Sequence, residues 1–281
     1  AYGQIARHKT DSYAVFADVT WHATDRLDIT PGLRFDYEQA AARATGGVTP
    51  DDEDTFSALS PKLGASYGLT DNLRHYGLFS TGFKAGGFTR TLTTANIAYT
   101  YDPQKTYNGE VGLKYRNDDR TLGAQLSAYY NVTKDYQMFV GVQPLQYLQN
   151  VGEVTARGVD LKLRAKPTDA LGITVGLGYN DTKFTDYRNP VTPGTNLTDN
   201  RVPYAPEFTA NLMLDYRFEL QNDAGAIIPY AALSYVSEVY FDETNTIGQK
   251  GYGLVDLGVK WELDKNVAAE AFVTNVFDKT Y

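Results

Sequence analysis

Near its middle the chain reads Leu171-Gly172-Ile173-Thr174-Val175-Gly176-Leu177-Gly178-Tyr179. Large apolar side chains occupy every second position of this stretch, and glycine or threonine fills the positions between them. Because successive side chains of a β-strand point to opposite faces, the pattern predicts a strand with one apolar face. We expect this strand to cover residues 171–183.

The same alternation flanks six short turn signals, each of which contains an aspartate, at positions 25, 71, 118, 169, 223 and 264. A tight turn between two alternating segments is the pattern of a β-hairpin. Six hairpins give twelve antiparallel strands in meander order, predicted at 11–22, 27–39, 57–68, 73–83, 107–116, 121–133, 155–165, 171–183, 206–219, 227–239, 252–263 and 267–275.

Strand length and connection length together indicate an all-β fold, a transmembrane antiparallel meander β-barrel. The predicted strands have about 9–13 residues, whereas a soluble sandwich uses about 5–6 and a membrane-crossing strand about 9–11. Short turns at one end and long loops at the other are typical of outer-membrane barrels. The long connections are expected near 40–56, 84–106, 134–154, 184–205 and 240–251.

The two faces of the predicted strands differ in polarity. The polar face mixes acids and bases, such as Asp160, Lys162 and Arg164. The lumen wall of a barrel explains this mixture, and the solvated outer face of a soluble sheet would also explain it; strand length and loop asymmetry favour the lumen. The residues expected on the lipid side are Leu161, Leu163, Leu171, Ile173, Leu212 and Leu214.

Composition excludes several classes of protein. The 281 residues contain no cysteine, so disulfide scaffolds, cysteine-ligated zinc and cysteine nucleophiles are excluded. The formal net charge of −8 argues against a nucleic-acid binder, which needs a basic face for phosphates. No apolar run reaches the roughly 18–20 residues of a membrane-spanning helix.

Five motifs, in order along the chain, resemble those of the TonB-dependent outer-membrane receptors of Gram-negative bacteria. They are SPKLGASY at 60–67, GFKAGGF at 82–88, EVGLK at 110–114, NVG at 150–152 followed by RGVD at 157–160, and NVFDKTY at 275–281. The fourth motif has Asp160 where the family pattern has glutamate. The likeness extends from about residue 11 to residue 281.

The resemblance implies that residues 1–281 form part of a larger barrel domain. The family's barrels have 22 strands and a plugged lumen, so the twelve predicted strands would correspond to about strands 10 to 21. The plug domain, the first strands and the last strand are then expected to be absent, and residues 1–10 to be the tail of a preceding loop. The alternative is a smaller closed barrel of twelve strands, because an even number is permitted.

The resemblance also implies a function and a location. A receptor of this family lies in the outer membrane, in contact with lipid and lipopolysaccharide, and imports a scarce ligand when the TonB complex acts on its plug region. Ferric siderophores are the commonest ligand class, and haem, cobalamin and saccharides remain open. The alternatives are a passive diffusion porin or another outer-membrane barrel. No enzyme, cofactor or nucleic-acid partner is expected.

Candidate ligand-binding residues are aromatic side chains placed well inside the long loops. Aromatic rings at a barrel mouth are suited to grip a flat, partly apolar ligand, although the aromatic girdle of the membrane interface would explain loop-end aromatics equally well. The candidates are Phe88, Tyr99, Tyr101, Tyr187 and Tyr204. The acidic run Asp51–Asp54 is expected to be a mobile loop tip rather than a cation site, and no metal site or catalytic set is predicted.

Overall fold

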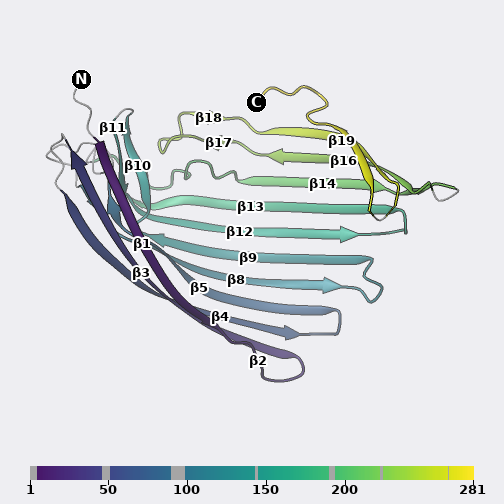
Figure 1. Cartoon of the computed structure of the whole chain (residues 1–281), viewed down its shortest axis with the longest axis horizontal. Helices are drawn as coiled ribbons and strands as arrows, with labels where there is room; N and C mark the ends of the chain where they lie inside the picture. Colours follow the sequence, from purple (N-terminus) through teal and green to yellow (C-terminus); the bar gives the residue numbers. More distant parts are fainter. Residues whose placement is uncertain are drawn as a thin grey trace.

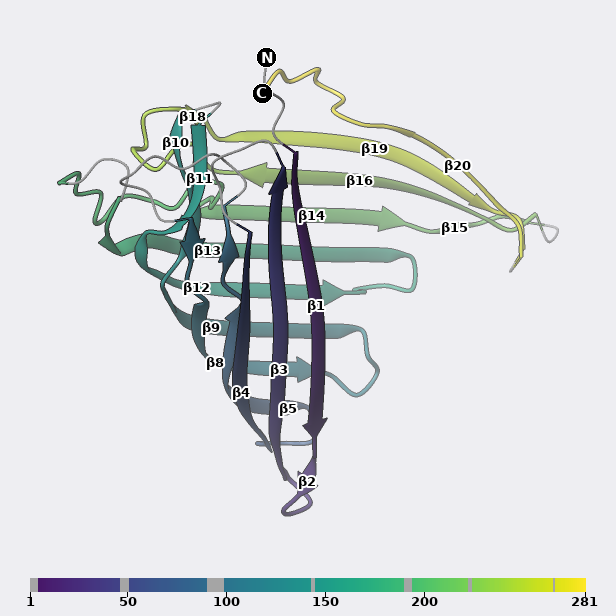
Figure 2. The same cartoon turned by 60° about the vertical axis from the view of Figure 1, so that its left-hand side comes forward.

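The computed structural model describes residues 5–45, 51–89, 99–142, 145–189, 194–221, 224–264 and 266–281. These residues form one large, curved antiparallel sheet in which twelve long strands pair in chain order (Figures 1 and 2). The described residues contain no helix that is long and apolar enough to cross a membrane. The predicted fold class, an all-β antiparallel meander, is confirmed.

The long strands are β1 (Ile5–Asp18), β3 (Leu27–Thr45), β4 (Asp52–Gly68), β5 (Leu73–Lys84), β8 (Gln104–Arg116), β9 (Leu122–Lys134), β12 (Gly152–Ala165), β13 (Leu171–Tyr187), β14 (Phe208–Tyr216), β16 (Ala226–Val236), β19 (Tyr252–Glu262) and β20 (Ala268–Val273). The short ones are β2 (Trp21–His22), β6 (Gly87–Phe88), β7 (Thr100–Tyr101), β10 (Gln137–Val142), β11 (Leu145–Asn150), β15 (Phe218–Glu219), β17 (Val239–Tyr240) and β18 (Gly248–Gln249).

The order of strands runs from β1 to β20 without returning, so the described strands form an open sheet with β1 and β20 at its two edges. The alternative of a closed barrel made of these twelve strands is therefore not what the structure contains. Each of the twelve predicted ranges overlaps one long strand. Two turn signals are partly outside the described residues, because positions 222–223 and 265 are not described.

Several predicted boundaries are wrong at the ends of strands. The loop expected near 40–56 is mostly strand, because β3 continues to Thr45 and β4 begins at Asp52. Ala42 still pairs with Asp52, and both Ala40 and Ala42 are buried, so packing overrides the low strand preference of alanine. The tail expected over residues 1–10 is strand from Ile5 onward.

Other predicted strands are interrupted. The range 206–219 breaks at Arg217, whose guanidinium forms ion pairs with Glu219 and Glu262, and continues as β15. The range 227–239 ends at Val236 and resumes as β17. In the range 11–22, β1 ends at Asp18 before the short strand β2. Periodicity alone does not locate these breaks.

Cross-strand register joins the alternating patterns into two continuous faces. Leu161 lies opposite Leu177 of β13 on one side and Leu126 of β9 on the other. Val175 lies opposite both Leu163 and Leu212. The residues predicted on one face therefore do share it: Leu161, Leu163, Leu171, Ile173, Leu212 and Leu214. We call this the apolar face, and the opposite one, which carries Asp160 and Lys162, the polar face.

Tyrosines of the polar face cover glycines on the neighbouring strand. Tyr76 lies opposite Gly112, where a Cβ would approach the tyrosine ring to 2.5 Å, and its hydroxyl donates a 2.6 Å hydrogen bond to Glu110. An aromatic ring over a strand glycine replaces the packing that the glycine lacks. The arrangement recurs in the pairs Tyr129–Gly158 and Tyr230–Gly258.

Candidate ligand-binding surface at the loop end

The long connections gather at one end of the sheet, opposite the short turns. The β10–β11 hairpin and the β17–β18 pair belong to this loop layer (Figure 1). The β6–β7 pair, whose Phe88 packs in one of its clusters, belongs to it as well. Nearly all of the buried apolar side chains of the described residues lie here or at the adjoining strand ends, in two clusters. The described part of the loop layer therefore has an apolar core of its own.

The first cluster fastens residues 83–88 to the ends of β3 and β4. Phe88 is 5% exposed and packs with Ala40, Ala42 and Phe56. The ring of Tyr99 lies against that of Phe88, with centroids 5.5 Å apart. Two of the predicted ligand-binding aromatics thus contact each other inside an apolar cluster.

The second cluster fastens the β10–β11 hairpin to the ends of β12 and β13. It comprises Val140, Tyr147, Val151, Val154, Phe184, Tyr187 and Val202. Tyr187, another predicted ligand-binding residue, is 5% exposed and meets Phe184 edge to face. Burial, together with the nearby charge of Glu243, raises the pKa of the Tyr187 phenol to about 12.

A buried polar junction ties three connections together between the two clusters. The amide nitrogen of Gln137 donates hydrogen bonds to the carbonyl oxygens of Ala85 (2.8 Å) and Asp102 (2.9 Å). Asn150 donates to the carbonyl oxygens of Asp102 (2.9 Å) and Asp135 (2.7 Å) and accepts from the Asp102 backbone N–H (2.7 Å). Neither residue is aromatic, so neither is among the predicted site residues, although Asn150 opens one of the quoted motifs.

The fifth predicted aromatic, Tyr204, is exposed. Its ring is 72% exposed and lies 5.6 Å from that of Phe241, which is 43% exposed. The Tyr204 backbone has φ of 62° and donates a 2.9 Å hydrogen bond to the carbonyl oxygen of Tyr240. A positive φ is unfavourable for a bulky residue, so the surrounding loop contacts must hold this aromatic pair in place.

Hydrogen bonds between two loops, and others within one of them, supply that support. Asn245 accepts from the backbone N–H of Arg201 (2.8 Å) and donates to its carbonyl oxygen (2.9 Å). Asp242 accepts from the side chains of Thr244 and Thr246 and from the backbone N–H of Ile247. Burial would raise the pKa of Asp242, but these hydrogen bonds outweigh it and hold the pKa well below its usual range.

Of the cavities in the described part of this layer, two are lined by predicted aromatics. One, of about 520 Å³, lies between the polar face near Arg34 and Glu38 and the loop residues Phe88 and Tyr101. The other, of about 730 Å³, is lined by Tyr101 and Tyr187 among others. The structure therefore brings Tyr101 together with Phe88 in one cavity and with Tyr187 in another, while Tyr204 stands apart beside Phe241.

The acidic run does not form a loop tip. Asp52, Glu53 and Asp54 belong to β4, and Glu53 lies 3.4 Å from the Arg43 guanidinium. The expectation of a mobile tip is wrong over these residues because β4 starts earlier than the alternating pattern suggests. Within the described ranges, no three His, Cys, Asp or Glu side chains are grouped so that they could hold a metal ion.

Comparison with known proteins gives a consistent result. Residues 2–276 match the family described as TonB dependent receptor-like, beta-barrel. The pesticin receptor of Yersinia pestis is 31% identical over 286 residues, which cover 96% of this chain and 40% of that protein. The probable TonB-dependent siderophore receptor PiuA of Acinetobacter baumannii is 26% identical, over 97% of this chain and 38% of that protein.

Among solved structures, the ferric yersiniabactin uptake receptor FyuA from Yersinia pestis aligns with a TM-score of 0.83 at 25% identity. The alignment covers 98% of this chain and 42% of that one. The chain thus spans about 40% of the length of the curated relatives it matches.

Proposed function

The chain belongs to the TonB-dependent receptor β-barrel family, and on this basis we propose that it forms part of the wall of an outer-membrane receptor that imports a ferric siderophore into the periplasm with energy supplied through TonB. The observation that carries the proposal is the 31% identity with the pesticin receptor over 96% of the chain. The similar PiuA is named as a siderophore receptor and the similar FyuA as an uptake receptor for ferric yersiniabactin, which supports an iron chelate as the ligand class.

The exposed apolar face supports an outer-membrane location. Leu63, Val111 and Leu177 on this face are roughly half exposed, which is expected of side chains that contact lipid. Exposed aromatics flank the band at the turn end (Tyr67, Tyr115, Tyr216 and Trp261) and at the loop end (Tyr37, Tyr107, Tyr130, Tyr179, Phe208 and Tyr235).

The spacing of these two aromatic rows fits a membrane. Tyr107 and Tyr115 are eight residues apart on β8, as are Phe208 and Tyr216 on β14. Eight residues span about 27 Å along a strand, or about 21 Å along the membrane normal at a strand tilt of about 40°, which is of the same order as the roughly 25 Å apolar band of outer-membrane barrels. The rows are then the two interface girdles, with lipopolysaccharide as the partner at the loop end.

Within the loop layer we assign two roles to the predicted aromatics. Tyr101, which lines both cavities, and Tyr204, which is exposed beside Phe241, are proposed to contact the ligand directly. Phe88, Tyr99 and Tyr187 are proposed to act from within the apolar clusters, where they fix the shape of the cavities.

Transport assays test the proposal. In a strain that lacks the gene, uptake of radiolabelled iron from a panel of ferric siderophores is expected to fall, and expression of the intact gene is expected to restore it. A protonophore or loss of TonB should abolish the restored uptake. Uptake that is restored but insensitive to both treatments would replace the proposal with passive diffusion, and no dependence on the gene for any iron chelate would refute the ligand class.

A further inference from the structure

Two lysines lie directly opposite each other on the apolar side of the sheet, where its strands reach the loop end. The register pairs Lys105 of β8 with Lys134 of β9. Each lies eight positions from a leucine of the apolar face, Lys105 from Leu113 and Lys134 from Leu126, so alternation places both lysines on that face. We call these two residues the lysine pair.

The lysine pair lies just beyond the aromatic row of the loop end. On β8, Tyr107 is two positions from Lys105, and on β9, Tyr130 is four positions from Lys134. These separations correspond to about 7–13 Å along a strand. In the proposed outer-membrane location, on which this inference rests, the aromatic row marks the interface. The two ammonium groups are then at the level of the lipid head groups, where long basic side chains place their charge.

The lysine pair has no counter-charge within the described part of the chain. Neither ammonium group forms an ion pair with a carboxylate of the described residues, and both side chains are exposed. The Cβ atoms of directly opposed residues are about 4.5–5.5 Å apart, and like charges in such positions destabilise a sheet. An anion held by both lysines would remove this repulsion.

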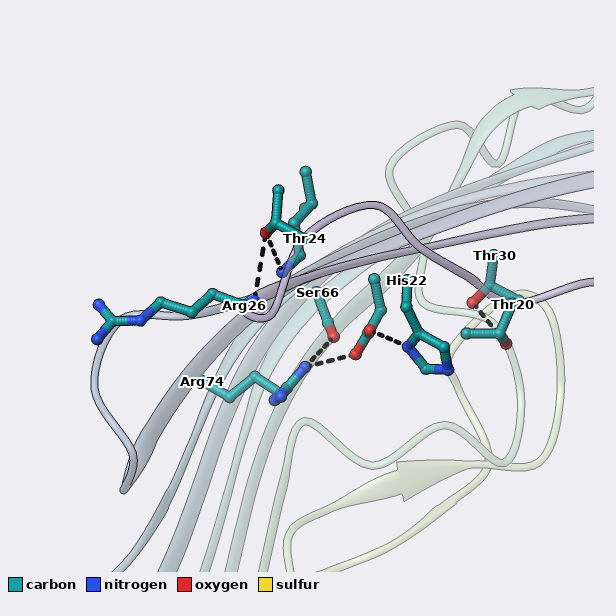
Figure 3. Close-up of polar contacts among 9 residues, drawn as sticks. Thr20, His22, Thr24, Arg26, Thr30, Ser66 and Arg74 are labelled. Carbon is teal, nitrogen blue, oxygen red and sulfur yellow. Dashed lines mark hydrogen bonds and ion pairs between the residues drawn. The ribbon is translucent and has the colours of Figure 1, made fainter.

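Two arginines show how cations elsewhere in the sheet are neutralised. Arg157, on the same face of β12, donates hydrogen bonds to Asp181 at 2.9 and 3.1 Å. At the turn end of the polar face, Arg74 donates to Asp28 at 2.7 Å and to Ser66 at 2.8 Å (Figure 3). Unlike these arginines, the lysine pair keeps its charge for a partner from outside the sheet.

An open groove of about 630 Å³ lies on the apolar face between the lysine pair and the turn end. It crosses β4, β5, β8 and β9 and is lined mainly by apolar residues. Gly109 lies in it between Phe79 and Tyr130. A Cβ at Gly109 would meet no atom closer than the carbonyl oxygen of Tyr130, at 3.9 Å, so packing within the sheet leaves this space unfilled. The groove is suited to hold the acyl chain of a lipid.

The groove and the lysine pair lie on the same two strands. Gly109 is four positions from Lys105 on β8, and Tyr130 is four positions from Lys134 on β9, so about 13 Å of strand separates the groove from the charges. β8 and β9 have described long strands on both sides (Figure 1). Because the apolar face is turned away from the lumen, the contents of the lumen do not cover this surface.

We propose that the lysine pair and the groove together bind one phosphorylated lipid of the outer leaflet, the lipid A part of lipopolysaccharide. The two lysines bind a phosphate of lipid A through charge-assisted hydrogen bonds, and the groove holds one of its acyl chains. Charge complementarity favours this occupant, because lipid A carries compact phosphate charges directly above its acyl chains. The site is separate from the cavities of the loop layer.

Native mass spectrometry of the detergent-purified protein, in its natural length and stripped of bound lipid, tests this proposal. Diphosphoryl lipid A and phosphatidylglycerol are titrated separately, and lipid A is expected to bind more tightly. Its binding should persist in EDTA, because lysines rather than bridging divalent cations neutralise the phosphate. The double variant K105Q/K134Q should weaken lipid A binding by about tenfold, since charge-assisted hydrogen bonds are lost.

Two further variants make the result decisive. G109L places a side chain in the groove and keeps both lysines, so it should also weaken lipid A binding. K114Q/K162Q is the matched control, because it removes the same charge from two exposed lysines of the polar face, and it should leave the binding unchanged. Heat-modifiable gel migration verifies that each variant is folded.

Unchanged lipid A binding in K105Q/K134Q or in G109L, or an equal loss in K114Q/K162Q, would overturn the proposal. Phosphatidylglycerol that binds as tightly as lipid A, or loss of lipid A in EDTA, would overturn it as well. Its failure is distinguishable from that of the proposed uptake function, which is measured with ferric siderophores in cells, whereas neither lipid carries iron.

Discussion

At Gly112 the missing side chain is replaced by the ring of Tyr76 from the neighbouring strand. In the sequence Tyr76 looks like an error in the alternation, because it is a large ring on the polar face. The structure explains it through its cross-strand partner, which lies 36 positions away in the chain and is invisible to a local pattern.

The substitution Gly112→Ala is expected to destabilise the protein by about 1–3 kcal/mol, because the added methyl group would displace the Tyr76 ring and its hydrogen bond to Glu110. The free energy of unfolding in urea measures this cost. Gly109→Ala, on the apolar face of the same strand, is the control, since its Cβ would meet only an atom 3.9 Å away. Equal effects of the two substitutions would contradict the role of the ring.

Two quoted motifs owe their residue types to backbone geometry. Gly152 has φ of 115°, and a Cβ there would lie 2.3 Å from the carbonyl oxygen of Asp186. Asn275 has φ of 49°, accepts a hydrogen bond from the Lys279 N–H and donates to the Lys279 carbonyl oxygen. Both residues are required by the local backbone conformation. The motifs could therefore be recognised from the sequence, but they do not show which residues contact a ligand.

At the scale of elements, the strands were predictable and the loop layer was not. Period-2 alternation located all twelve long strands because each has one apolar and one polar face. The β10–β11 hairpin was not predicted, because its apolar residues, such as Val140 and Tyr147, pack into a cluster formed by distant segments. For the same reason nothing local separates Tyr187, which is buried, from Tyr204, which is exposed.

The variant Gln137→Leu tests the junction that holds these elements together. It should leave the carbonyl oxygen of Ala85 without its side-chain donor, at a cost of about 1–3 kcal/mol, whereas the carbonyl oxygen of Asp102 loses one of two donors and keeps the hydrogen bond from Asn150. Hydrogen–deuterium exchange of the β10–β11 hairpin should accelerate while exchange of β12 stays slow. Gln39→Leu, at an exposed position of β3, is the control. Unchanged protection in β10–β11 would show that the junction does not hold the hairpin.

At the scale of the whole molecule, the apolar face continues across all twelve strands while the polar face mixes charges of both signs. Opposite charges lie across from each other in places, as Lys260 and Glu270 do on β19 and β20. In other places like charges lie near each other, as Lys114 and Lys162 do on either side of Gln125. The sequence predicted the mixture of charges, but only the register shows which charges are neighbours.

The variant Val175→Arg places a charge midway between the two aromatic rows on the apolar face. If this face contacts lipid, the substitution should cost about 2–4 kcal/mol in stability in bilayers. Thr174→Arg, on the polar face of the same strand, should cost much less, because its side chain is exposed to the lumen. Equal costs, measured by unfolding in lipid vesicles, would refute the assignment of the two faces.

The meander order also bears on how the sheet assembles. Every long strand pairs with the long strands immediately before and after it in the chain, so a strand that is already placed always offers an edge to the next one. The entropic cost of closing each connection grows only slowly with its length, so the short turns form hairpins first and the long loops add a modest delay. Assembly can then proceed as a zipper along the chain, with each completed hairpin serving as the template for its successor.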